Sequence, residues 1–290
     1  MFRLTVLGSG SSGNCALVET DRVRVLLDAG LSARQILARL ALVGLTPADI
    51  DAVLLTHEHG DHAGGLEVLC RRWNLPIYTN SLTADALRSG EQLTEHRNWR
   101  FFQTGRDFVI EDLTVQNFQV PHDAADPVGF VLNHDSGALG LLTDLGQVTK
   151  LAFQRIRHVS TLIIETNHDG PLLQQDTKRP WSVKQRILSR HGHLSNDAAA
   201  SAIGELRDSG GALERVVLGH LSRDCNRPEL AIGAVRAKAG VDLEIHCANQ
   251  SHVSAPFEIA SRQIKEQGTG KNEQDWASAD AAALAQKQLL

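Results

Sequence analysis

Five side chains able to bind a cation gather within six positions of the sequence, in the segment LLTHEHGDHAGGL. They are His57, Glu58, His59, Asp61 and His62. Imidazole and carboxylate groups without a thiolate suit zinc, manganese or iron. A lone histidine is most often a surface or core residue, but desolvating these groups together without a cation would be costly. The segment therefore predicts a metal site.

The spacing of these side chains predicts two ions rather than one. Asp61 and His62 are adjacent and project differently from His57 and His59, so one ion cannot take all four. Two neighbouring cations resolve this geometry, and a pair roughly 3.5 to 4 Å apart is a common device of hydrolytic enzymes. The chemistry indicated is hydrolysis by a water molecule that two cations share.

The segments that must position this cluster have the pattern of strands that end at a polar residue. DAVLLT at 51–56 predicts a short buried strand that delivers the cluster into a loop. Other strand-like segments end at Asp28, His122, Asp144 and His220, and TLIIET at 161–166 is a further strand. Polar residues at strand ends gather along one edge of a sheet assembly, where loops carry the chemistry on a rigid scaffold.

The first thirty residues contain a glycine motif that formally matches a dinucleotide-binding fingerprint. Gly8, Gly10 and Gly13 have the required spacing, but the fingerprint also requires a helix to follow. The segment at 15–30 instead alternates as two strands and a turn, which favours a glycine turn between strands. A helix is expected afterwards, over 31–45, with Ser32 and Gln35 as its capping box.

Composition limits the class of protein. The chain has 290 residues, of which 42% are hydrophobic and 22% charged, as in a globular domain. No apolar run reaches the roughly 18 residues of a membrane span, and the start lacks a signal-peptide pattern, so the cytoplasm is the expected location. Four scattered cysteines argue against a disulfide framework and a thiolate zinc site.

Charge and composition along the chain add two expectations. A net charge of -5 gives no general attraction to polyanions, so a nucleic-acid contact requires a local patch. Residues 1–264 are expected to form one hydrolase domain. The polar, alanine-rich segment 265–290 is expected to be a tail outside the core.

Taken in order, the polar strand ends resemble the five motifs of the metallo-β-lactamase-fold hydrolases. The resemblance implies an α/β fold, a four-layer αββα sandwich with two mixed β-sheets flanked by helices. It implies that one ion binds His57, His59 and His122, that the other binds Asp61, His62 and His220, and that Asp144 bridges them. Asp28 would brace the histidine loop, and His134 and His168 compete with His122 for the third motif.

A narrower resemblance comes from GSGSSGN, NHD, GHLSN and GHLSRDCN, which are similar to motifs of the YycJ/WalJ-like branch of this superfamily. That branch is described as 5' to 3' exonucleases. The resemblance implies a phosphodiesterase with two divalent ions, zinc or manganese, that attacks nucleic acid, with DNA as the expected substrate, through a metal-bridging hydroxide. Flavodiiron relatives carry a glutamate where this chain has His59, which disfavours redox chemistry.

Two residues are expected to act on the reacting atoms. Asp61 would orient the nucleophilic hydroxide while it binds metal. His193, in GHLSN, would donate a proton to the leaving alkoxide or bind a non-bridging phosphate oxygen. The alternative for His193 is that it only neighbours the cap of a helix, because Ser and Asn follow it.

Several residues are expected to contact the substrate outside the metal centre. The segment 177–196 has no acidic residue, and Lys184 and Arg186 would bind phosphates there while Trp181 stacks a base, unless the run is only a solvated helix face. Arg223 follows His220 closely and has the planar fork that grips phosphate. The glycine turn adds Ser9, Ser11 and Asn14, which alternatively satisfy turn backbone.

Other functions stay open from the sequence alone. They are hydrolysis of a small cyclic phosphodiester or of a thioester, and a metal-binding scaffold without turnover. The sequence also leaves open the metal, the choice between DNA and RNA, and the oligomeric state, a homodimer included.

Overall fold

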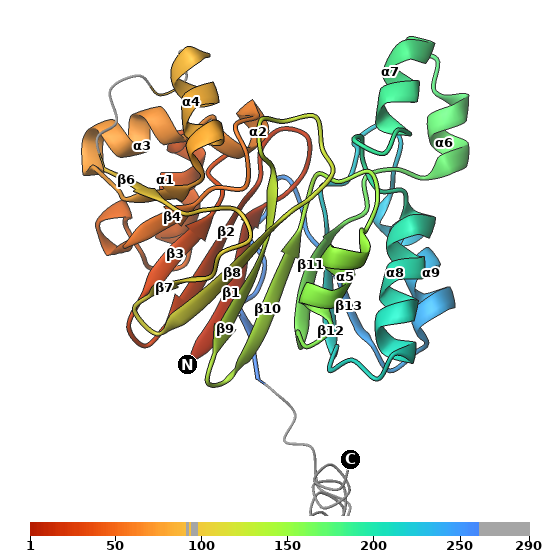
Figure 1. The fold of residues 1–290 in the computed structure, drawn as a ribbon. Helices are drawn as coiled ribbons and strands as arrows, with labels where there is room; N and C mark the ends of the chain where they lie inside the picture. The colour runs from red at the N-terminus through yellow and green to blue at the C-terminus, as the bar shows by residue number, and fades with distance from the viewer. Residues whose placement is uncertain (91–92, 94–97, 261–290) are drawn as a thin grey trace, which may run out of the picture.

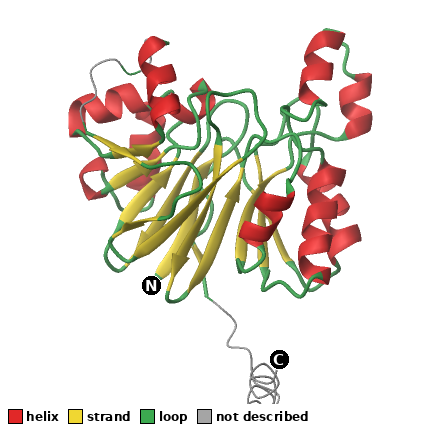
Figure 2. Cartoon of the chain, in the orientation of Figure 1, coloured by secondary structure: helices red, strands yellow, loops and turns green. Residues whose placement is uncertain are grey.

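The computed structural model describes residues 1–90, 93 and 98–260, and in it two β-sheets face each other with helices on both outer sides (Figure 1). The first sheet has the strand order β14-β1-β2-β3-β4-β5-β6 and the second the order β13-β12-β11-β10-β9-β8-β7. Figure 2 shows the strands as the inner layers and the helices outside them. This is the expected four-layer αββα sandwich.

Each sheet combines antiparallel and parallel pairs. In the first sheet β14, β1, β2 and β3 pair antiparallel, and β3, β4, β5 and β6 pair parallel. The first-sheet strands are β1 (Phe2–Gly8), β2 (Cys15–Thr20), β3 (Arg24–Leu27), β4 (Ala52–Leu54), β5 (Ile77–Thr79), β6 (Trp99–Phe101) and β14 (Phe257–Glu258).

The second sheet repeats this plan. Strands β7 to β10 pair antiparallel, and β10 to β13 pair parallel. Its strands are β7 (Phe108–Ile110), β8 (Leu113–Gln119), β9 (Val128–His134), β10 (Gly137–Leu142), β11 (Thr161–Glu165), β12 (Arg215–Gly219) and β13 (Glu244–Cys247). Both sheets are therefore mixed, as expected.

The helices cover the outer faces and form one lobe above the sandwich. The described helices are α1 (Ala33–Leu42), α2 (Gly60–Ala63), α3 (Leu66–Trp73), α4 (Ser81–Ser89), α5 (Lys150–Ile156), α6 (Gly170–Gln175), α7 (Trp181–Ile187), α8 (Asn196–Asp208), α9 (Pro228–Ala239) and a short 3-10 turn, Pro47–Asp49. Figure 1 shows α1 and α3 beside the first sheet, α5, α8 and α9 beside the second, and α6 with α7 as the lobe. Among the residues described, no helix is long and apolar enough to cross a bilayer.

Apolar side chains fill all three spaces between the four layers. Leu4 and Phe130 are buried between the sheets, Ile36 packs between α1 and the first sheet, and Ile203 packs between α8 and the second. Burying one such side chain stabilises the fold by roughly 1.5 to 3 kcal/mol. The layers therefore hold the strand ends, and the loops that follow them, in fixed positions.

The local expectations from the sequence hold where the structure describes them. The glycine motif is followed by β2 and not by a helix, which confirms the rejection of a dinucleotide site. Ser32 and Gln35 cap α1 reciprocally, as expected. The tail expected at 265–290 lies outside the described residues.

Candidate metal centre

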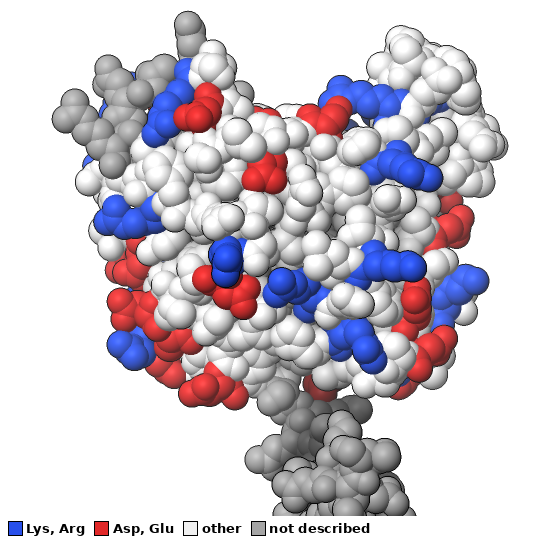
Figure 3. Space-filling view, in the orientation of Figure 1, with Lys and Arg blue, Asp and Glu red and all other residues white. Residues whose placement is uncertain are grey.

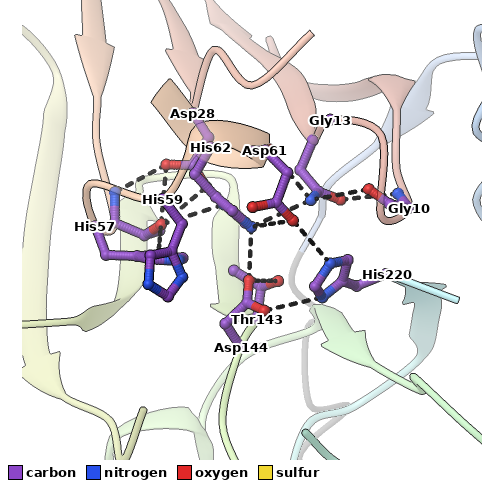
Figure 4. Close-up of polar contacts among 12 residues, drawn as sticks. Gly10, Gly13, Asp28, His57, His59, Asp61, His62, Thr143, Asp144 and His220 are labelled. Carbon is purple, nitrogen blue, oxygen red and sulfur yellow. Dashed lines mark hydrogen bonds and ion pairs between the residues drawn. The ribbon is translucent and has the colours of Figure 1, made fainter. Parts of the chain in front are cut away.

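The polar residues that end the strands meet where the loops of both sheets converge (Figure 4). Four overlapping groups of potential ligand atoms form there, and within each group the atoms lie within 4.8 Å of one another. The groups are His57, His59 and His122; His57, His62 and Asp144; Asp61, His62 and His220; and Asp144, Glu165, His193 and His220. The structure thus brings together all seven residues predicted to bind metal.

Direct contacts show how closely these side chains converge. His62 Nε2 lies 2.6 Å from Asp144 Oδ2, and His220 Nε2 lies 3.2 Å from Asp61 Oδ2. On the other side of the cluster, His122 Nε2 lies 3.3 Å from His59 Nδ1. His122 is therefore in the cluster, whereas its competitors lie elsewhere: His134 is near Asp112, and the ring nitrogens of His168 have no hydrogen-bond partner within the described chain.

Groups behind the histidines fix how their rings are turned. His62 Nδ1 donates to Asp28 Oδ2 at 2.7 Å, and His122 Nδ1 donates to the carbonyl of Gly192 at 3.2 Å. Both acceptors lack a proton, so in the neutral form each ring carries its proton on Nδ1 and presents its Nε2 lone pair to the centre. Hydrogen bonds of this kind typically orient the ligands of a metal. Asp28 thus contacts a side chain of the histidine loop directly.

Backbone contact holds the Asp28 loop directly against the histidine loop. Ala29 N–H donates to the carbonyl of His62 at 2.8 Å. A Cβ atom on Gly30 would lie 1.7 Å from the carbonyl oxygen of Asp61, so only glycine allows this approach. The sequence Asp-Ala-Gly after β3 therefore belongs to the same local unit as the histidine cluster.

The donor set fits divalent cations. His57 is 1% exposed, its Nδ1 lies 2.9 Å from Thr56 Oγ1, and its Nε2 has no hydrogen-bond partner among the described residues. A buried polar atom without a partner costs about 1 to 3 kcal/mol, which a coordinated cation would offset. Nitrogen and oxygen donors without thiolate are those expected for zinc or manganese.

Electrostatics in the cluster favour ionised carboxylates. Burial would raise the pKa of Asp144, but the imidazoles of His220 and His62 outweigh burial and hold that pKa well below its usual value. Burial would lower the pKa of His62, yet Asp144 and Asp28 raise it to about 10. His57 differs, because burial and the charge of His62 both lower its pKa. The Asp144 carboxylate is thus ionised and available to neutralise cations.

Glu165, at the end of β11, is a member of the site that sequence reasoning missed. Its side chain is fully buried, and Oε1 accepts hydrogen bonds from Nδ1 of His193 at 2.7 Å and Nδ1 of His220 at 2.8 Å. Oε2 accepts the backbone N–H groups of Leu145 and Leu194. Burial would raise its pKa, but His193 and these hydrogen bonds lower it to about 2. A carboxylate ending a buried apolar strand was the available signal.

His193 lies beside the cluster and is the accessible member of this group. Its Nδ1 is 2.7 Å from Glu165 and 3.2 Å from Asp144, while the side chain is 24% exposed. Burial would lower its pKa, but Glu165 and Asp144 raise it to about 10. The helix cap is a separate feature, because Ser195 caps α8. His193 therefore stands at the surface of the centre as a proton-bearing group.

The basic segment differs from the sequence expectation. Lys184 was expected to bind phosphate, but it is 7% exposed and its Nζ donates to the carbonyl of Gln174 at 2.9 Å, so a phosphate contact would have to replace this hydrogen bond. Arg186 is exposed but pairs with Asp123, next to His122. Figure 3 shows Lys and Arg interspersed with Asp and Glu over this face rather than gathered in a continuous basic surface.

The other predicted contacts lie around the glycine turn. Asn14 is buried, with its Nδ2 3.1 Å from His62 Nε2 and its Oδ1 bonded to Ser9 Oγ, so it belongs to the turn and the histidine loop. Ser11 is exposed. Arg223 is also exposed, and its Nη2 lies 3.4 Å from Ser12 Oγ. Trp181 is 63% exposed on α7.

A four-layer sandwich with clustered histidines and aspartates at its loop edge defines the metallo-β-lactamase class of proteins. The chain belongs to this family: residues 23–221 match the family model described as the beta-lactamase superfamily domain. Fold and cluster together make it a metal-dependent hydrolase.

Two named proteins and one solved structure are similar to most of this chain. The chain is 37% identical to the exodeoxyribonuclease WalJ of Streptococcus pneumoniae over 84% of this chain and 91% of the relative. It is 37% identical to the exodeoxyribonuclease YycJ of Bacillus anthracis over 79% of this chain and 86% of the relative. Among solved structures, the metallo-beta-lactamase fold protein YhfI of Bacillus subtilis has a TM-score of 0.67 and 20% identity, covering 87% of this chain and 98% of that one.

Proposed function

We propose that this protein is a two-metal phosphodiesterase that removes nucleotides from the 5' ends of DNA. The observation that carries the proposal is the convergence of seven potential ligands beside a histidine, His193, that Glu165 holds in place. The similarity to two proteins named exodeoxyribonucleases supports DNA as the substrate. The four cysteines are free, in keeping with a reducing cytoplasm.

The ligands divide into two sets. His57, His59 and His122 would hold one divalent ion, and Asp61, His62 and His220 the other. Asp144 would serve both, because its Oδ1 lies 3.9 Å from His122 Nε2 of the first set and its Oδ2 lies 2.6 Å from His62 Nε2 of the second. When bound, two zinc or manganese ions supply positive charge to a phosphate oxygen and lower the pKa of water.

The chain's own residues then have distinct tasks. Asp61, whose side chain is 28% exposed, accepts a hydrogen bond from the attacking water and so orients it toward phosphorus. As the bond between phosphorus and the leaving oxygen breaks, His193 donates its proton to that oxygen. Glu165 keeps the His193 ring turned for this transfer through the 2.7 Å contact with Nδ1.

Substrate discrimination tests the proposal. The protein loaded with manganese or zinc is offered 5'-labelled DNA, bis-p-nitrophenyl phosphate and a glutathione thioester, each with a metal-chelated control. We expect mononucleotides from the labelled DNA and slower hydrolysis of the small diester. Turnover of the thioester alone would contradict the proposal, and full metal loading without hydrolysis of any phosphodiester would indicate a scaffold.

A further inference from the structure

A pocket of about 220 Å³ lies next to the metal centre, on the side of His220. Three loops enclose it: the glycine turn at 9–12, the segment 221–228 and the segment 248–250. Ser9 joins the pocket to the centre, because it lines the pocket while its Oγ accepts the backbone N–H of His220 at 2.8 Å. A group bound in the pocket would therefore lie beside the reacting phosphate.

The lining of the pocket fits an anion. Of the described residues that line it, Arg223 alone is ionisable, and none carries a carboxylate. Its polar neighbours in the wall are neutral hydroxyls and amides: Ser9, Ser11, Ser12, Ser222, Asn226, Asn249 and Gln250. Arginine with hydroxyl donors is a set that binds phosphate oxygens, and the planar guanidinium can engage two of them.

Arg223 forms no ion pair with a described residue, so its charge is available for this task. Within the described chain its side chain makes one hydrogen bond, from Nη2 to Ser12 Oγ at 3.4 Å, and Ser12 also lines the pocket. By contrast, Arg186 pairs with Asp123 and Lys178 with Asp224. Hydrogen bonds within the protein already hold Gln250 against the glycine turn. Gln250 Oε1 accepts Ser12 N–H at 2.8 Å, and Gln250 Nε2 donates to the Gly13 carbonyl at 2.9 Å.

Helix α9 adds to the preference for negative charge, and the volume limits the size of the occupant. Pro228, the first residue of this twelve-residue helix, lines the pocket, so the positive end of the helix dipole faces it. Pockets for drug-sized ligands usually measure roughly 300 to 1,000 Å³. At about 220 Å³ the space suits a phosphate with part of its sugar.

We propose that this pocket binds the substrate phosphate that neighbours the scissile one, with Arg223 as its anchor. The inference rests on the proposed function, since it takes a polynucleotide as the substrate. The phosphate can have two sources: a terminal monoester, in which case the pocket recognises the end of the strand, or the next diester along the chain.

The experiment compares Arg223→Ala and Arg223→Lys with the wild-type, metal-loaded protein. Substrates are one oligonucleotide with a phosphate or a hydroxyl at its 5' end, the same oligonucleotide with a phosphate or a hydroxyl at its 3' end, and bis-p-nitrophenyl phosphate. The matched control is Arg236→Ala, at the far end of α9, where the guanidinium donates to the Val241 carbonyl. Circular dichroism and metal content verify that each variant is folded and loaded.

We expect Arg223→Ala to lower kcat/KM for oligonucleotides about ten- to a hundredfold more than for the small diester, as is typical for loss of charge-assisted hydrogen bonds. Arg223→Lys should lose less, and Arg236→Ala should match the wild type. A loss confined to one phosphorylated end assigns the pocket to a terminal monoester, and a loss independent of end groups assigns it to an internal diester.

Two results would overturn the proposal. Equal losses on oligonucleotides and the small diester would place Arg223 at the scissile phosphate, and no loss at all would leave the pocket without a role in binding. Either result leaves the proposed function standing if the wild-type protein degrades DNA. Failure of the wild type to hydrolyse any oligonucleotide would reject both.

Discussion

Three residues of the centre share an uncommon backbone conformation. Asp28, Asp144 and His220 have φ values of 59°, 51° and 55°, in the left-handed region that residues other than glycine rarely occupy. Asp28 and His220 directly follow β3 and β12, and Asp144 is the second residue after β10. The sharp turn stops the strand and directs the side chain to the centre. Such conformations persist where surrounding structure enforces them, which is common at functional sites.

Asp28→Asn tests the bracing role of this carboxylate. The change keeps the shape of the side chain but removes the charge that accepts the His62 Nδ1 proton at 2.7 Å and the Thr56 N–H at 2.8 Å. We expect metal affinity to fall about 10- to 100-fold, as when hydrogen-bond partners of metal ligands are removed elsewhere. Competition with a chromophoric chelator measures it. Unaltered affinity in a folded variant would refute the bracing role.

His193→Ala separates catalysis from metal binding. We expect the variant to keep the metal content of the wild type and to lose about 10²- to 10⁴-fold in kcat, the usual contribution of a positioned acid. The exposed His246, at the edge of the second sheet, supplies the control variant His246→Ala. Loss of metal from His193→Ala would show that this residue is a metal ligand. Its position beside Asp144 is compatible with that role.

The sequence alone pointed to the seven potential ligands that the structure brings together. What it did not show about Glu165 and Lys184 has physical reasons. The seven ligand candidates could be found because histidine and aspartate directly after apolar strands have few other uses. Glu165 was missed because a single glutamate gives no spacing signal of its own. The burial of Lys184 was not predictable, because a basic run shows charge but not direction, and its carbonyl partner on Gln174 depends on how α6 and α7 pack.

At the scale of the elements, buried asparagines form hydrogen bonds between the three loops that follow β11, precede α8 and follow β12. Asn196 and Asn226 exchange hydrogen bonds through their side chains at 2.9 and 2.8 Å, and Asn226 also donates to the Thr166 carbonyl at 2.7 Å. Asn167 donates to the carbonyl of His220 at 3.1 Å. These hydrogen bonds join the loops that carry Glu165, His193 and His220. This explains the asparagines in the NHD, GHLSN and GHLSRDCN segments.

Asn226→Ala should loosen this unit. The change leaves the buried amide of Asn196 and the Thr166 carbonyl without their partner, at about 1 to 3 kcal/mol of unfolding free energy. We also expect kcat to fall, because the loops that carry Glu165, His193 and His220 lose a hydrogen bond that joins them. Urea unfolding and steady-state kinetics measure both, against Asn98→Ala, whose amide bonds the Asn74 carbonyl at the surface. Wild-type stability would show that the network is dispensable.

The lobe of α6 and α7 provides a second test among the elements. Lys184→Ala removes a buried hydrogen bond and the packing of the lysine stem, so we expect a loss of about 1 to 3 kcal/mol in urea unfolding. Arg186→Ala breaks only an exposed ion pair, which contributes about 0.2 to 1 kcal/mol. If instead Lys184→Ala stays fully stable and weakens DNA binding, the original expectation of a phosphate contact would be correct.

Strand positions were predictable because a short apolar segment between turn residues has few alternatives to a buried strand. The expected strands before Asp28, His57, Asp144 and His220 are all present, as are the capping box of α1 and the glycine turn. The pocket beside His220 was not predictable. It forms where loops more than 200 residues apart in sequence meet, and no local pattern reports such a meeting.

For the whole molecule, the sandwich is what creates the centre. Loops of the first sheet supply the histidine cluster and Asp28, whereas loops of the second supply His122, Asp144 and His220. Neither sheet alone holds a complete set of ligands. The apolar layer between the sheets therefore sets the distances on which metal binding depends. Sequence resemblance predicted this architecture, but atomic distances follow only from the packed layers.

Metal-edge anomalous diffraction from crystals grown with excess manganese or zinc tests the central claim most directly. The account predicts two ions in the centre, one bound by His57, His59 and His122, the other by Asp61, His62 and His220, with Asp144 between them. Elemental analysis of the same protein should give two equivalents per chain. A centre without metal at saturating concentration, or ions bound only elsewhere on the molecule, would contradict the account.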